Sequence, residues 1–305
     1  MNINLPIKNQ PTVIVEATTS NDISSLDTNE IKGLFKEHGA ILFRGFSLDI
    51  DKFSNFSDRF CKSFVSNESP GREVLSKDGR VQTVNLGQLH FLLHPEISRE
   101  PWQPDIAFFA CETPSSIGGE TTVCDGVAVV KAFSPELFSH LKSSKLAHTV
   151  PTTLDWGRKF LNKPEIQLSE LLDDLSYKSV HFSMKDKELF RTYVRPMLHK
   201  PMFTDELAYG NFLVFARRRL QISYFPCYLD GSEILDNIVD EIENITNQFS
   251  SEIKWQKNDL VMLDNTRFMH GRNPIGDPQK RRIYTQFGYS SFAPKDHPNM
   301  DCQPL

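Results

Sequence analysis

The spacing of apolar residues predicts helices near the start of the chain and on its flanks, with short strands between them. Between Asp27, which can cap a helix, and Gly39, which can end one, the apolar residues recur at the helical interval. The same interval predicts further helices at residues 49–64, from Ser134 onward and at 234–249. Helices with one apolar stripe are expected to cover a core.

Short apolar runs that end at turn residues predict strands between these helices. The runs lie at residues 40–44, 105–111, 120–124, 212–225, 252–256, 260–263 and 282–289. Residues 66–80 are polar and predict a loop, whereas residues 150–210 combine prolines, charges and weak periodicity. We expect this second stretch to be an irregular, lid-like insertion beside a binding site. Many strands with flanking helices predict a β-rich α+β fold, which we assign to a single domain over residues 1–305.

Composition and charge limit the classes of function. A hydrophobic content of 39% with 23 Phe is enough for a sizeable core, and a net charge of −5 argues against nucleic-acid binding. No run of about 18 apolar residues appears, so no membrane span is expected. The five cysteines contain no C-x-x-C pair, which predicts free thiols and a cytoplasmic protein.

A His-x-Glu motif and a distant histidine are the candidate chemistry of the chain. His94 and Glu96 point to the same face if their segment is extended, and His270 can join them only if the fold returns it there. Two imidazoles and one carboxylate with open positions opposite suit non-haem Fe(II) and O2 chemistry. His90 precedes His94 by four residues, and its extended context favours a structural or substrate-facing role over metal binding.

Five segments, in order along nearly the whole chain, resemble the taurine dioxygenase and clavaminate synthase-like family of Fe(II)- and 2-oxoglutarate-dependent oxygenases. They are HGAILFRGF at 38–46, HPE at 94–96, ETPSSIGGETTVCDG at 112–126, NDLVMLDNTRFMHGR at 258–272 and RRIYTQ at 281–286. The resemblance implies a double-stranded β-helix, or jelly-roll, with flanking helices. It also implies that His94, Glu96 and His270 bind Fe(II).

The cosubstrate residues follow from the same resemblance. It implies that Arg282 binds the C5 carboxylate of 2-oxoglutarate and that Thr121 contacts the same molecule. A guanidinium suits a carboxylate because its parallel donors match the two oxygens. Arg281 and Arg282 both lie at the family's distance from the distal histidine, and only one of two strand neighbours can point inward. The Arg-Arg-Ile triplet of the family selects Arg282 over Arg281.

The implied reaction oxidises an unactivated C–H bond with O2, while 2-oxoglutarate is converted to succinate and CO2. Hydroxylation is the expected outcome, and the same machinery can desaturate, epoxidise or close rings. Related halogenases carry a small residue at the place of Glu96, so a carboxylate there favours oxygenation.

The substrate is expected to be a small amino-acid-derived or natural-product molecule, free or tethered to a carrier. The taurine enzyme has a second arginine four residues beyond its cosubstrate arginine, and Gln286 takes that place here, which argues against a sulfonate. A glutamate at the metal resembles the clavaminate synthase and amino-acid hydroxylase branch. Gln286, His90 and Arg218 are the candidate substrate contacts, and the stretches 81–93 and 150–225, which contain the last two, are expected to contact the substrate.

Two functions of other classes remain open. A cupin-like barrel could bind a ligand without catalysis, although the intact triad and arginine argue against this alternative. A zinc hydrolase could use the same ligands, but it leaves Arg282 without a role.

Overall fold

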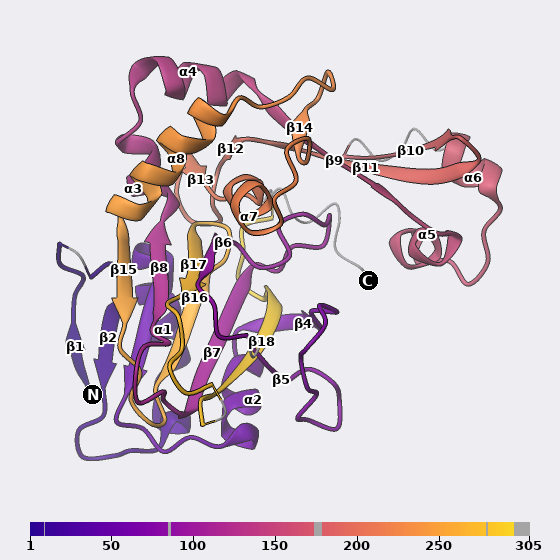
Figure 1. Cartoon of the computed structure of the whole chain (residues 1–305). Helices are drawn as coiled ribbons and strands as arrows, with labels where there is room; N and C mark the ends of the chain where they lie inside the picture. Colours follow the sequence, from indigo (N-terminus) through magenta and orange to yellow (C-terminus); the bar gives the residue numbers. More distant parts are fainter. Residues whose placement is uncertain (9, 85–86, 174–178, 279, 296–305) are drawn as a thin grey trace.

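The computed structural model describes the chain except for residues 9, 85–86, 174–178, 279 and 296–305. Two β-sheets lie face to face, helices flank them, and an arm extends to one side (Figure 1). Within the described part, no helix combines the length and apolarity that crossing a bilayer requires.

The larger sheet has the strand order β1-β2-β3-β16-β7-β18-β4, with β5 paired to β18. Its strands are β1 (Asn2–Asn4), β2 (Val13–Glu16), β3 (Ala40–Arg44), β4 (Cys61–Val65), β5 (Gln82–Thr83), β7 (Ile106–Thr113), β16 (Leu260–Asp264) and β18 (Arg282–Ser290). β2 and β3 pair in parallel, whereas β3, β16, β7 and β18 pair antiparallel. The central strands are buried on both faces, which explains their continuous apolar runs.

The smaller sheet has the strand order β15-β8-β17-β6. Its strands are β6 (Phe91–His94), β8 (Thr121–Asp125), β15 (Ser250–Ile253) and β17 (Phe268–Arg272). Phe109 and Phe287 of the larger sheet share one hydrophobic cluster with Val123 and Phe268 of the smaller sheet. The core therefore lies between the two sheets, in the sandwich that a jelly-roll requires.

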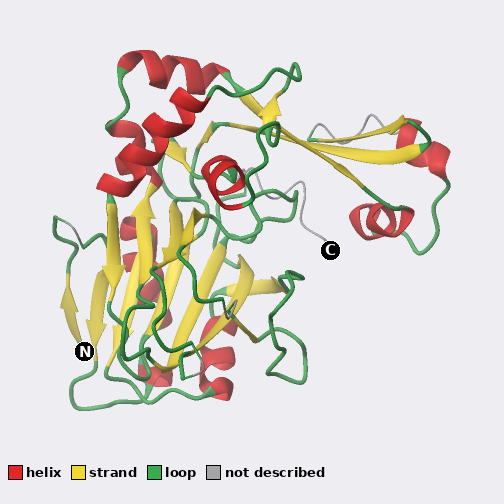
Figure 2. Cartoon of the chain, viewed as in Figure 1, coloured by secondary structure: helices red, strands yellow, loops and turns green. Residues whose placement is uncertain are grey.

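Helices pack behind the larger sheet and at one end of the smaller one, as Figure 2 shows. They are α1 (Thr28–His38) and α2 (Ile50–Asp58) on the larger sheet, and α3 (Gly126–Lys131), α4 (Pro135–Ser143), α7 (Leu213–Arg219) and α8 (Asp236–Gln248) on the smaller one. Asp27 caps α1 by accepting a hydrogen bond from the Glu30 N–H, and Gly39 ends it in a left-handed conformation, as predicted.

Residues 145–173 and 179–196 form the arm, which is more regular than the insertion expected at 150–210. Three of its strands pair in the order β10-β11-β9, and β14 joins them from outside the arm. The elements are β9 (Lys145–Pro151), α5 (Leu154–Leu161), α6 (Leu168–Asp173), β10 (Val180–Lys185), β11 (Glu188–Pro196) and β14 (Cys227–Tyr228). β10 and β11 are mostly exposed or half-buried, so no buried face imposes an alternating pattern on their sequence. A small pair of strands, β12 (Leu198–His199) and β13 (Ala208–Tyr209), follows the arm.

Two element predictions are wrong. The strand predicted at 212–225 is the helix α7, followed by a turn. Residues 213–216 are all buried, and a continuous apolar run does not separate a buried strand from a buried helix. The helix predicted at 49–64 ends at Asp58, because Cys61–Val65 pairs with β18 as a strand.

Candidate metal and cosubstrate site

The two histidines of the predicted triad lie opposite each other on neighbouring strands. His94 is the last residue of β6, and the antiparallel register pairs it with His270 of β17. Directly opposed residues point to the same face of a sheet, and here the two ring centroids are 4.7 Å apart. The fold therefore returns the distant histidine to the motif.

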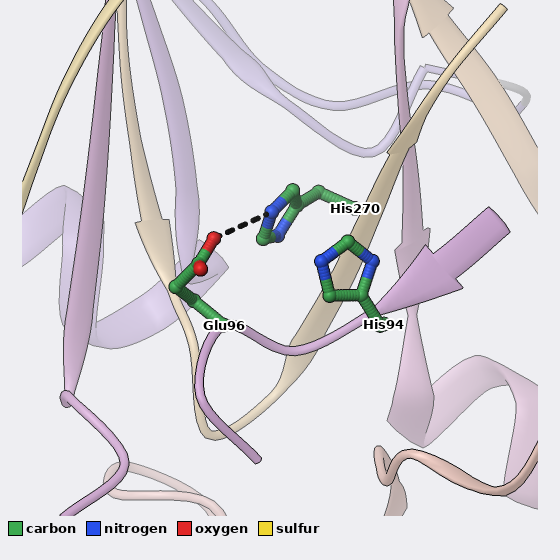
Figure 3. Close-up of side chains that lie close together, drawn as sticks. All are labelled: His94, Glu96 and His270. Carbon is green, nitrogen blue, oxygen red and sulfur yellow. Dashed lines mark ion pairs between the residues drawn. The ribbon is translucent and has the colours of Figure 1, made fainter. Parts of the chain in front are cut away.

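Glu96 completes the group, two residues beyond the end of β6. Its Oε2 lies 3.3 Å from Nε2 of His270 (Figure 3). One possible ligand atom from each of the three residues lies within 4.8 Å of the others, and all three residues are buried. The structure thus brings together the three residues that the sequence singled out.

Burial and neighbouring charges hold His94 and Glu96 in the protonation states that a metal needs. Burial lowers the pKa of His94 to about 4, and His270 adds to the effect. Burial would raise the pKa of Glu96, but Arg72 and His270 outweigh it and the pKa falls to about 2. Nδ1 of His94 lies 2.8 Å from the Leu92 carbonyl oxygen, which can accept its proton and leave Nε2 as the metal-binding atom. Neutral imidazole and ionised carboxylate are the forms that bind a cation.

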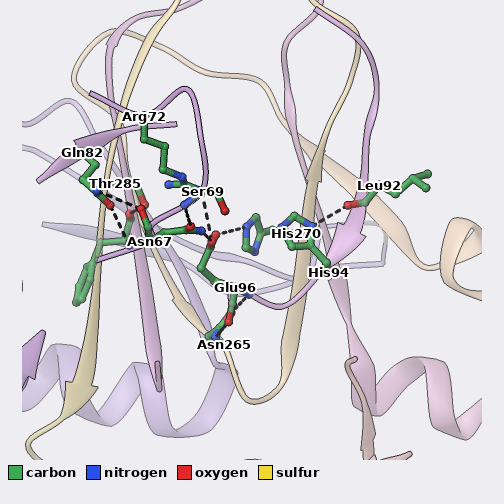
Figure 4. A network of polar contacts seen from close by, with 11 residues as sticks. Asn67, Ser69, Arg72, Gln82, Leu92, His94, Glu96, Asn265, His270 and Thr285 are labelled. Atoms are coloured by element: carbon green, nitrogen blue, oxygen red, sulfur yellow. Dashed lines mark hydrogen bonds and ion pairs between the residues drawn. The ribbon is translucent and has the colours of Figure 1, made fainter. Parts of the chain in front are cut away.

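Hydrogen bonds hold Glu96 at both its side chain and its backbone (Figure 4). Asn67 Nδ2 donates to Oε1, and Arg72 Nη2 lies 3.3 Å from the same oxygen. Asn265 accepts from the Glu96 N–H at 2.7 Å and donates to its carbonyl at 3.1 Å. The sequence marks neither Asn67 nor Arg72, because both lie in the polar loop at 66–80 and belong to no motif.

A small pocket adjoins the triad, and Thr121, Arg272 and Arg281 are among the residues that line it. Arg281 is 4% exposed, and its Nε donates to the Gly119 carbonyl at 3.0 Å. Burial, followed by the charge of Arg272, lowers the pKa of Arg281 to about 10, which leaves it charged at neutral pH. No carboxylate in the described part of the chain forms an ion pair with Arg281. The pocket therefore presents a buried cation to an anionic ligand.

Arg282 points away from this pocket, contrary to the orientation that its expected role requires. Its side chain is 52% exposed, and its Nε lies 2.8 Å from Oε2 of Glu112. Neighbours in an extended chain face opposite sides, so an inward Arg281 leaves Arg282 on the outside. The Arg-Arg-Ile match thus selects Arg282, which points outward. Arg281, the alternative that the sequence leaves open, is the arginine that lines the pocket.

Thr121, the residue expected to contact the cosubstrate, lines the small pocket. Trp255 Nε1 donates to Thr121 Oγ1 at 3.0 Å. Because an indole N–H only donates, the Thr121 hydroxyl keeps its own hydrogen for a ligand. The turn before this strand carries Gly119, with a φ of 77°, and an added Cβ there would lie 3.1 Å from Arg281 Cδ. A glycine at this turn therefore leaves room for the arginine.

The three residues expected near the substrate lie elsewhere. Gln286 faces α2, and Ser57 Oγ donates to its Oε1 at 2.9 Å. His90 is exposed, and Arg218 pairs with Glu243 of α8 at 2.7 Å. None of the three is among the described residues that line the cavities beside the triad. For Arg218 the reason is that α7 is a helix, so an argument from strand alternation does not apply.

A larger cavity of about 950 Å³ borders His94 and Glu96 and shares several wall residues with the small pocket. The shared residues are Arg72, Phe91, His94 and Glu96. The arm contributes Trp156, Lys159 and Arg191 to the wall. An even larger groove of about 1180 Å³ beside α2 contains no member of the triad, so volume alone does not identify the site.

Several known proteins resemble this chain over most of its length. The dapdiamide synthesis protein DdaC of Enterobacter agglomerans is 23% identical over 295 residues, which cover 88% of this chain and 89% of DdaC. The 3-((Z)-2-isocyanoethenyl)-1H-indole synthase of Fischerella ambigua is 25% identical over 279 residues, with 88% and 89% of the two chains covered. The crystal structure of PvcB from Pseudomonas aeruginosa has a TM-score of 0.63 at 16% identity and covers 95% of this chain and 93% of its own, which confirms the predicted jelly-roll fold. Residues 7–285 match the model of the family described as taurine catabolism dioxygenase TauD, TfdA family. Since this match spans most of the sequence, the chain belongs to the TauD/TfdA family of dioxygenases.

Proposed function

We propose that this dioxygenase holds Fe(II) with His94, Glu96 and His270 and uses 2-oxoglutarate and O2 to oxidise a small molecule. The convergence of the three side chains within 4.8 Å of one another carries this proposal. Two imidazoles and a carboxylate, with open positions opposite, are the ligand set of non-haem Fe(II) oxygenases. Bound Fe(II) would supply the activation of O2 that the side chains of the protein cannot provide.

The neighbouring pocket fits 2-oxoglutarate. Arg281 binds the carboxylate far from the metal, and Thr121 donates a hydrogen bond to the same group. Three features support these roles: Arg281 is buried, it has no ion-pair partner among the described residues, and the Thr121 hydroxyl has its hydrogen to spare. Apolar side chains such as Phe109 and Ile283 line the rest of the pocket and limit its access to water.

Glu96 owes its position to residues outside the triad. Asn265 holds its backbone, while Asn67 and Arg72 hold one carboxylate oxygen and leave Oε2 on the side of His270. Such partners orient a ligating carboxylate and raise the affinity of a site for its metal.

The substrate binds in the larger cavity, which borders the triad and the arm. Two relatives are named for the synthesis of dapdiamide and of an isocyanoethenyl indole, which supports a small amino-acid-derived or natural-product substrate, free or attached to a carrier. Hydroxylation is the proposed outcome. If the substrate lay about an ångström away from the position that favours hydroxylation, the outcome would be desaturation, epoxidation or ring closure. The four described cysteines are free thiols, which supports the cytoplasm as the location.

Succinate release tests the proposal. Purified protein is supplied with Fe(II), 2-oxoglutarate, O2 and a panel of amino acids and amino-acid conjugates, and succinate is measured. We expect at least one compound to raise succinate formation in an O2-dependent manner, with loss of the response in His270→Ala. Turnover without O2 would indicate a hydrolase, and an absence of succinate with every compound would indicate a binding protein.

A further inference from the structure

Arg72 lies at the boundary between the cosubstrate pocket and the larger cavity, and it lines both. Its side chain is 9% exposed. Nη2 lies 3.3 Å from Oε1 of Glu96, and the guanidinium carbon lies 5.5 Å from the ring centroid of Phe287. Nε and Nη1 are buried, and neither has a hydrogen-bond partner among the described residues. Buried N–H groups of this kind are costly unless a ligand accepts from them.

The charges around the triad also favour an additional anion. The small pocket is lined by one carboxylate, Glu96, and by three guanidinium groups, those of Arg72, Arg272 and Arg281. A divalent cation bound to Glu96 would add to this positive charge. The two carboxylates of 2-oxoglutarate offset only part of the total, because one binds beside the metal and the other binds Arg281. Of these three arginines, Arg72 is the one that also lines the larger cavity.

We infer that Arg72 binds a carboxylate of the substrate. This inference rests on the proposed function and narrows its substrate class to small molecules that carry a free carboxylate, such as amino acids and their derivatives. A molecule with a single carboxyl group has no carboxylate left when it is tethered to a carrier through that group, so for such molecules the free form is the substrate. Because Arg72 also contacts Glu96, the oxidised carbon lies close to the substrate carboxylate along its chain.

Other cavity arginines lack these properties. Arg191 already pairs with Glu100 at 2.5 Å and lies over the Trp156 ring at 4.3 Å. Arg99 is exposed and lies over Phe212, with its guanidinium carbon 5.4 Å from the ring centroid. Arg72 is the guanidinium that combines burial, unsatisfied donors and contact with the triad, whereas Arg99 provides a matched control of the same residue type in the same cavity wall.

Calorimetric binding of matched probes tests the inference without turnover. Protein is loaded with Mn(II) and N-oxalylglycine, an inert analogue of 2-oxoglutarate. It is then titrated with a series of monocarboxylates from acetate to phenylacetate, and with the neutral primary amide of each. We expect the best carboxylate to bind at least about tenfold more tightly than its amide, since a charge-assisted hydrogen bond contributes this much. R72M should abolish the preference, and R99M should retain it.

The outcomes separate this inference from the proposed function. Failure of the wild-type protein to bind Mn(II) and N-oxalylglycine would overturn both. Binding of these two with no preference for any carboxylate would overturn the role of Arg72 alone. So would an R72M protein that keeps the preference but binds N-oxalylglycine poorly, because Arg72 would then serve the cosubstrate. If R72M loses Mn(II), the decision falls to R72Q, whose neutral amide can still donate to Glu96 but carries no charge. Loss of the preference in R72Q supports the inference, and a full preference contradicts it.

Discussion

The triad and the larger cavity beside it differ in how the sequence specifies them. The register of two paired strands places His94 and His270, so a spacing rule and a matching segment are enough to find these two residues. The wall of the larger cavity comes from the loop at 66–80, the helix α7 and the arm. Side chains there are placed by long-range packing, which no short motif records. Candidate metal-binding residues on paired strands can be found from the sequence. Candidate substrate contacts in a cavity wall built from loops require the structure.

Loss of a triad histidine should have the largest effect. We expect His270→Ala to lower succinate formation more than about a hundredfold, beyond the range for residues that only support a metal ligand. His90→Ala is the matched control, because His90 is exposed and outside both cavities; it should keep near wild-type activity. Equal losses of succinate formation in the two variants would show that the strand register does not identify the metal-binding histidine.

The pair Arg281 and Arg282 gives the next largest contrast. Arg281→Met should weaken 2-oxoglutarate binding by about ten- to hundredfold, the cost of a charge-assisted hydrogen bond, while Arg282→Met should change it little. The apparent KM for 2-oxoglutarate, measured at saturating substrate, distinguishes the two. A larger effect from Arg282→Met would return the cosubstrate role to the residue that the family match selects.

Asn265 tests whether the hydrogen bonds to Glu96 matter as much as the strand β6 that precedes this residue. Asn265→Ala removes the bonds to the Glu96 backbone, and the affinity for Mn(II) should fall by about ten- to hundredfold. Equilibrium dialysis against Mn(II) measures this, and circular dichroism monitors folding. Unchanged affinity would mean that Asn67, Arg72 and the preceding strand hold the carboxylate in place without Asn265.

The arm should affect the substrate and not the metal. Trp156 packs beside Trp102 with ring centroids 5.0 Å apart and lies under Arg191. Trp156→Ala should weaken substrate binding by about threefold to tenfold, the contribution of one aromatic contact, and leave the affinities for Mn(II) and 2-oxoglutarate unchanged. A matching loss of Mn(II) affinity would show that the triad and the larger cavity are not independent.

Much of the fold could be predicted because its signals are local. The caps of α1 at Asp27 and Gly39 and the apolar run of β3 depend on neighbouring residues only. The apolar run of the buried helix α7 predicts a strand because it is continuous and therefore shows no helical periodicity. The regular strands of the arm were missed for the opposite reason, since they bury neither face fully.

The candidate site divides in the same way. The triad and Thr121 follow from motifs. The choice between Arg281 and Arg282 depends on which face of their strand points into the pocket, and the sequence does not give this face. Asn67 and Arg72 contact Glu96 from a loop that is 24 to 29 residues away in sequence, and no spacing rule connects them to it. Their discovery needed the packed structure.

An anaerobic titration with Fe(II) and 2-oxoglutarate is the most direct test of the metal centre. The account predicts a weak visible charge-transfer band that needs both components, saturates at a single iron per chain and disappears in His270→Ala. Folded wild-type protein that gives no such band, or a band that survives in His270→Ala, would contradict it.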